Sequence, residues 1–182
     1  ADAPYRIEPG RAIPVLLLLR HADRFPVTVE SAIAGLRGSD GSETEYPLIE
    51  NPIRVDSRSW HRVFHVRPPD GMTGEVTIDV RLDVRRPGDA GSRTVVNRNL
   101  PGVKPMPLVV RLAEDALPVS DNCRFADLHC HSEYTDDQVE YGAPLDALAE
   151  TAPAMGLSAA AVTDHSYDLD DLEGEFRVKD PG

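Results

Sequence analysis

Two histidines on either side of one residue give this sequence of 182 residues its clearest chemical signal. Asp127, His129 and His131 alternate with Leu128 and Cys130. Successive side chains of a β-strand point to opposite faces, so a strand here would place the three polar side chains on one face. Residues two apart on a strand lie roughly 6.5 Å apart at Cα, near enough for two imidazoles to bind one divalent ion. The spacing indicates a metal site, but such histidine pairs also occur on exposed strands without a metal.

More polar side chains follow this strand and a second apolar run. Asp136 and Asp137 lie in the loop after the first strand, and Asp164 and His165 follow the apolar residues 158–162. The C-terminal ends of parallel strands lie side by side in α/β architectures and carry their functional sites. We therefore expect the polar groups after the two strands to meet in space.

The elements that would position these groups form a βαβ unit. Residues 125–131 and 157–163 are typical of buried parallel strands, because they are mostly apolar on both faces. Residues 144–155 between them have apolar side chains at helical spacing, and Pro144 suits the first helical turn. Pro153 lies inside this helix, where its ring clashes with the preceding turn, so we expect a kink or an early end there.

The run FADLHCHSEYTDD at 125–137, followed by AVTDHS at 161–166, resembles the first two motifs of PHP domains, the polymerase and histidinol phosphatase superfamily. The resemblance implies a distorted (βα)7 barrel that holds two or three divalent metal ions and hydrolyses phosphoesters. It also implies that four side chains are metal ligands: His129, His131, Asp136 and His165.

The resemblance assigns supporting roles to three carboxylates. Asp127 and Asp164 would orient the ligands, and Asp164 is the predicted catalytic residue. Asp137 stands where the family usually has glycine, so whether Asp136 or Asp137 binds the metal is open; the other would orient ligands. Ser166 stands where a further Asp is common. Zinc, manganese and iron all suit mixed imidazole and carboxylate ligands.

The resemblance covers about residues 124–170, and the later motifs of the family have no counterpart in this sequence. We expect the chain to be the N-terminal part of a longer enzyme. The alternative is a truncated domain that holds at most one metal.

The first 120 residues predict a different architecture. Residues 75–85 alternate apolar and polar side chains, and a turn rich in Pro and Gly separates them from residues 93–96, which predicts a β-hairpin. Further strands are predicted near residues 13–19, 27–33, 62–66 and 108–112. The pattern predicts a two-domain chain: an antiparallel Ig-like β-sandwich over residues 1–120, then the PHP-like α/β part over residues 121–182.

Two further histidines lie in a predicted strand of the sandwich. His61 and His65 are four residues apart, about 13 Å along a strand, which is too far to share an ion. We interpret them as surface histidines, whereas Trp60, Phe64 and Val66 should face the core.

Composition limits the partners. The formal net charge is -12, and residues 121–182 carry 15 acidic and 3 basic side chains. Nucleic acid is therefore not expected as the main partner, because phosphate backbones bind clustered Lys and Arg. No apolar run approaches the roughly 18 residues of a membrane-spanning helix. Two cysteines do not make a disulfide framework, and the first residues do not resemble a signal peptide, so we expect a cytoplasmic protein.

Together these observations predict a metal-dependent phosphoesterase of the PHP type, acting on a small phosphorylated substrate, with its oligomeric state open. Two alternatives remain. The chain could be a non-catalytic binding protein built on the β-sandwich, with a truncated PHP remnant, or that remnant could hold a metal with a purely structural role.

Overall fold

The computed structural model describes residues 1–97, 104–118, 122–135 and 142–165. The strands are β1 (Arg6–Ile7), β2 (Ile13–Arg20), β3 (Val27–Gly38), β4 (Glu43–Ile49), β5 (Ile53–Val55), β6 (Ser59–Val66), β7 (Gly74–Arg85), β8 (Arg93–Val96), β9 (Leu108–Leu112), β10 (Ala126–Cys130) and β11 (Ala159–Val162). The helices are α1 (Leu145–Thr151) and the 3₁₀-helix η1 (Ala152–Met155). The predicted β-rich fold is confirmed.

A large sheet contains seven of these strands, in the order β1-β9-β7-β3-β4, with β5 paired to β3 and β8 to β7. The alternating strand β7 lies at its centre and pairs antiparallel with β3, β8 and β9, so the predicted hairpin is confirmed. The strand β1 pairs with β9 in parallel. The sheet is therefore mixed, whereas the sequence predicted a purely antiparallel sandwich. The prediction was wrong on this point because a strand of two residues leaves no pattern in the sequence.

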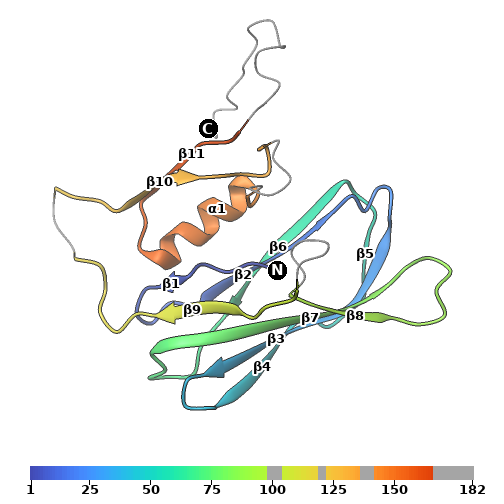
Figure 1. Ribbon diagram of the computed structural model, residues 1–182, viewed down its shortest axis with the longest axis horizontal. Coiled ribbons are helices and arrows are strands. Elements are labelled where there is room, and N and C mark those ends of the chain that lie inside the picture. The colour runs from blue at the N-terminus through green and yellow to red at the C-terminus, as the bar shows by residue number, and fades with distance from the viewer. Residues whose placement is uncertain (98–103, 119–121, 136–141, 166–182) are drawn as a thin grey trace, which may run out of the picture.

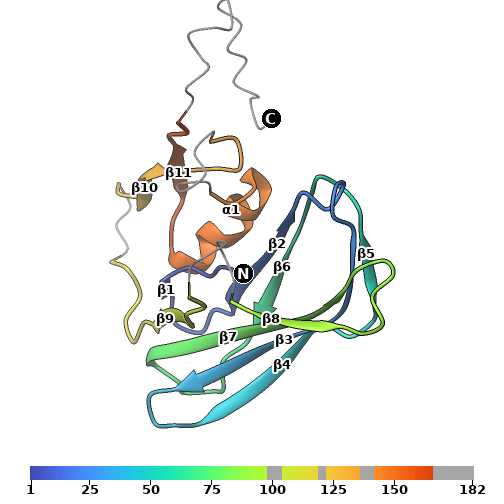
Figure 2. The ribbon, with the colours of Figure 1, turned by 45° about the vertical axis from the view of Figure 1, so that its right-hand side comes forward.

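The strands β2 and β6 form a second, antiparallel sheet over eight residue pairs, from Ile13↔Val66 to Arg20↔Ser59. Figures 1 and 2 show this pair lying over the large sheet. Alternate residues of β2, β3 and β7 fill the core between them, and Val15, Val29 and Ile78 are completely buried. Burial of such a side chain stabilises the fold by roughly 1.5–3 kcal/mol.

The C-terminal residues form the predicted βαβ unit. The strands β10 and β11 are parallel, with Ala126 opposite Ala159 and Cys130 opposite Val162, and their register shifts between these pairs. The helix α1 ends at Thr151 and continues as η1, whose first turn contains Pro153, so the predicted early end is confirmed. In both views α1 lies between the β10–β11 pair and the β2–β6 sheet (Figures 1 and 2).

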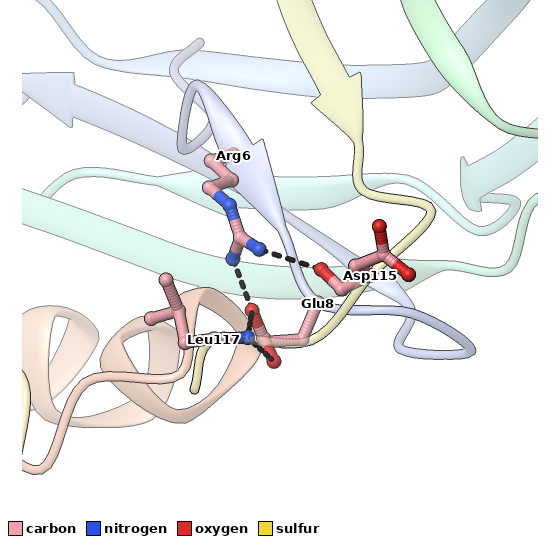
Figure 3. Close-up of polar contacts among 4 residues, drawn as sticks. All are labelled: Arg6, Glu8, Asp115 and Leu117. Atoms are coloured by element: carbon pink, nitrogen blue, oxygen red, sulfur yellow. Dashed lines mark hydrogen bonds and ion pairs between the residues drawn. The ribbon is translucent and has the colours of Figure 1, made fainter. Parts of the chain in front are cut away.

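Polar contacts of β1 connect the sandwich to the C-terminal part. The Glu8 carboxylate accepts the Leu117 N–H at 3.1 and 3.2 Å and pairs with Arg6, whose guanidinium also donates to the Asp115 carbonyl at 3.0 Å (Figure 3). The backbone N–H of Glu8 donates to the carbonyl of Ala154 in η1 at 2.8 Å. One residue thus holds both the segment after β9 and the helical turn.

The outer face of β6 contacts α1. His61 Nε2 lies 3.1 Å from the Asp146 carboxylate, and His65 Nε2 lies 3.6 Å from that of Glu150. Both imidazoles were expected on the surface, and their side chains are 28% and 50% exposed. The structure shows that each imidazole has a carboxylate partner on α1. The sequence of β6 does not reveal these partners because α1 lies far from β6 along the chain. Trp60 and Phe64 pack against the core, as predicted.

The strands β10 and β11 are more exposed than the sequence predicted. Leu128 is 78% exposed and Val162 is 42% exposed. Parallel strands are buried when helices cover both faces of their sheet. Among the described residues, α1 is the one α-helix of this unit, so the strands stay partly exposed. Within the same residues, no helix has the length and apolarity needed to cross a membrane.

Candidate functional site

The structure brings three predicted ligands together at the ends of β10 and β11. His129 lies near the end of β10, His131 directly follows this strand, and His165 lies three residues after β11. The ring centres of His129 and His131 are 5.2 Å apart, and those of His131 and His165 are 4.8 Å apart. Parallel pairing explains this meeting, because it places the two C-terminal strand ends at the same edge of the sheet.

Asp127 and Asp164, the two predicted supporting carboxylates that the structure describes, both accept hydrogen bonds. Asp127 Oδ1 accepts the N–H of His129 at 3.0 Å. The two oxygens of Asp164 accept the N–H and the hydroxyl of Ser132, both at 2.5 Å. Asp127 therefore supports the strand that carries His129, and Asp164 joins the segment after β11 to the turn after β10. Asp136 and Asp137, the remaining predicted residues, lie outside the described part of the chain.

The chemistry and spacing of the imidazoles suit a divalent cation. Two imidazoles that bind one tetrahedral zinc at about 2.0–2.1 Å have ring centres about 5 Å apart, close to the two spacings observed. Within residues 1–97, 104–118, 122–135 and 142–165, no three His, Cys, Asp or Glu side chains form a ready-made cation site. The rings are thus close enough to share an ion, but a bound ion would require adjusted side-chain torsions or an additional ligand.

Cys130 lies between the two histidines in the sequence, but its thiol is engaged by the neighbouring strand. Its Sγ is 3.3 Å from the carbonyl of Ala161, to which it can donate. Burial raises the pKa of this thiol above its usual range, and the negative charges of Asp127 and Asp164 raise it further. The thiol therefore stays protonated at neutral pH.

Two hydroxyl residues of the site were not predicted from the sequence. Ser132 is completely buried and Thr135 is 5% exposed. The Thr135 hydroxyl accepts the N–H of His165 at 2.9 Å and lies 3.4 Å from the carbonyl of the same residue. A Ser and a Thr spaced three apart directly after the histidine pair were the available signal, but hydroxyl residues in loops are usually solvated.

The segment after β11 is also bound directly to β10. Thr163 donates both its backbone N–H, at 2.8 Å, and its hydroxyl, at 3.2 Å, to the carbonyl of Cys130. The position of the Thr163–Asp164–His165 sequence therefore follows from pairing with the strand that carries the other two histidines.

Comparison with known proteins assigns no family to this arrangement. No family model matches the chain, and no curated protein matches it. The chemistry of the site therefore has to be argued from its own residues.

Proposed function

We propose that residues 121–182 carry the first βαβ part of a PHP-like metal-dependent phosphoesterase domain, and that an Ig-like β-sandwich precedes it. The observation that carries this proposal is the meeting of three imidazoles from two parallel strand ends, with ring centres 5.2 and 4.8 Å apart. Imidazole is a common ligand of zinc, manganese and iron, and three such groups at one edge of a sheet suit binding of a divalent ion.

The chain's own residues have separable roles in this proposal. His129, His131 and His165 would hold the metal, together with Asp136, the fourth ligand that the sequence predicts. A bound divalent ion supplies a Lewis acid for the phosphate and lowers the pKa of a water molecule to about 7. Asp164 remains the proposed catalytic residue, because each of its oxygens can accept a further hydrogen bond beside the one from Ser132.

The charge balance of the C-terminal sequence supports a cation-dependent mechanism. Residues 121–182 carry 15 acidic and 3 basic side chains, which would repel a phosphate ester that approached alone. Divalent ions held by the imidazoles would offset this repulsion and attract a small phosphorylated substrate. A substrate bound through Lys and Arg would need the opposite charge balance.

The proposal is tested by substituting His131, the central ring of the three. The protein is loaded with Zn²⁺ or Mn²⁺, dialysed and subjected to elemental analysis, and hydrolysis of p-nitrophenyl phosphate is measured in parallel. We expect His131→Ala to lower the affinity for the ion at least tenfold, because one of three neighbouring imidazoles is removed. Far-UV circular dichroism verifies that the variant folds.

The matched control is His21→Asn, in a turn outside the site. His21 has a φ of 62°, a conformation that Asn tolerates well, so this variant removes an imidazole without straining the backbone. Its bound metal should equal that of the unsubstituted protein. Equal metal content in His131→Ala and His21→Asn would refute the proposed ligands. Specific metal binding without any hydrolysis would favour the structural-metal alternative.

A further inference from the structure

The buried hydroxyl of Ser132 joins the segment that follows β10 to the segment that follows β11. This hydroxyl donates to Asp164 Oδ2 and accepts the N–H of Tyr134 at 3.1 Å, while the Ser132 N–H donates to Asp164 Oδ1. The Ser132 carbonyl accepts the N–H of Thr135 at 3.3 Å and that of Gly142 at 2.9 Å. Each polar group of Ser132 therefore fixes part of the site.

Thr135 forms a second connection between the same two segments. Its hydroxyl lies between the N–H and the carbonyl of His165, at 2.9 and 3.4 Å, so it can accept from one and donate to the other. The bond from the His165 N–H fixes the backbone of that residue, and the direction of its Cα–Cβ bond with it. The ring of His165 lies 4.8 Å from that of His131, which begins the segment after β10.

Residues 142 and 143 also form backbone hydrogen bonds with the turn after β10. Glu133 donates its N–H to the carbonyl of Ala143 at 3.1 Å, in addition to the bond between Gly142 and Ser132. A Cβ atom at Gly142 would overlap the carbonyl oxygen of His131, so only glycine allows this approach. These contacts fix the backbone of the turn that contains Thr135, so its hydroxyl can hold His165 in one position.

We infer that Thr135 is a positioning residue that sets the orientation of the His165 ring toward His131. The inference deepens the proposed function, because it assigns this pair of rings a hydroxyl that prepares it for a divalent ion. Residues that orient a metal ligand commonly change metal affinity 10- to 100-fold when they are removed. The hydroxyl of Thr135 acts through the backbone of His165 and does not itself touch the ion.

The experiment compares Thr135→Val with Thr135→Ser in the full chain. Valine keeps the shape of threonine without its hydroxyl, whereas serine keeps the hydroxyl. The first measurement uses metal-free protein and records, by NMR, the nuclear Overhauser effect between the His131 and His165 rings and the hydrogen exchange of the His165 amide. The second measurement is calorimetric titration with Mn²⁺ or Zn²⁺.

Thr135→Val should lose the contact between the rings, exchange the His165 amide at least tenfold faster and bind the ion 10- to 100-fold more weakly. Thr135→Ser should restore all three properties to within a few-fold. An unchanged ring contact and amide exchange in Thr135→Val would overturn the inference, whatever the metal affinity. If the unsubstituted protein binds no ion but Thr135→Val still loses the ring contact, positioning by Thr135 stands and the proposed metal function fails.

Discussion

Gly156, which ends η1, provides a sharp test of how the sandwich and the C-terminal part pack together. Its φ is 80°, a left-handed conformation that costs another residue roughly 1–2 kcal/mol. A Cβ atom at this position would also lie 3.0 Å from Cγ and Cδ of Glu8 and 3.0 Å from Cδ1 of Leu117. Gly156→Ala therefore adds crowding to the backbone cost.

The crowding lowers the stability because Glu8 cannot move away without losing a hydrogen bond. Its carboxylate accepts the Leu117 N–H, and hydrogen bonds to charged groups contribute roughly 1.5–3 kcal/mol. If Glu8 stays in place, overpacking costs about 1–3 kcal/mol instead. On either route, we expect Gly156→Ala to lower the free energy of unfolding by roughly 2–5 kcal/mol.

The control is Gly71→Ala. Gly71 has a φ of 78°, and a Cβ atom there would meet nothing within 4 Å, so this variant has the backbone cost alone. Urea unfolding at equilibrium gives both free energies by linear extrapolation. Gly156→Ala should be the less stable variant by at least about 1 kcal/mol, and the difference should shrink in a Glu8→Ala background. Equal losses in the two glycine variants would refute the proposed packing between Glu8, Leu117 and Gly156.

Two further predictions concern the large sheet. Asn97 is 4% exposed, and its Oδ1 accepts the N–H of Val80 at 2.7 Å. Asn97→Ala leaves that buried donor without its partner, so thermal and urea unfolding should show a loss of roughly 1–3 kcal/mol, and Asn97→Gly should not restore it. Hydrogen bonds from the Thr94 and Ser31 hydroxyls lower the pKa of Asp83 in the folded protein. Ionised Asp83 therefore stabilises the fold at pH values above the pKa that this residue has in the unfolded chain, and the stabilisation is lost as the pH falls through its folded pKa. Asp83→Asn should therefore be less stable than the unsubstituted protein at pH 7, and a difference that persisted undiminished well below pH 4 would contradict this reading.

The strands of the core could be predicted because their pattern is local. The alternation of β7 and the apolar residues of β2 and β9 are sufficient to identify these three strands. The edge strand β4 was missed because it contains Pro47 and because its exposed residues alternate with residues that are only half-buried. The two residues of β1 form a strand because β9 is available to pair with them, which no local pattern reveals.

The candidate site also has features that the sequence could predict and features that it could not. The meeting of His131 with His165 follows from two parallel strands and could be predicted from the sequence. The buried hydroxyls of Ser132 and Thr135 could not, because their partners lie in the segment after β11 and a loop hydroxyl carries no periodic signal. The contact of His61 with Asp146 was missed for the same reason, since it joins residues of separate elements.

The position of Glu8 has a mechanical consequence. Its side chain accepts a hydrogen bond from Leu117 while its backbone donates one to Ala154, so the sandwich is bonded both to the segment after β9 and to η1. Any swing of α1 and η1 away from the sandwich must break these bonds together with the contacts from β6. We therefore expect the two halves to unfold as one cooperative unit. A force that pulls on β1 would be transmitted to the helix that precedes β11.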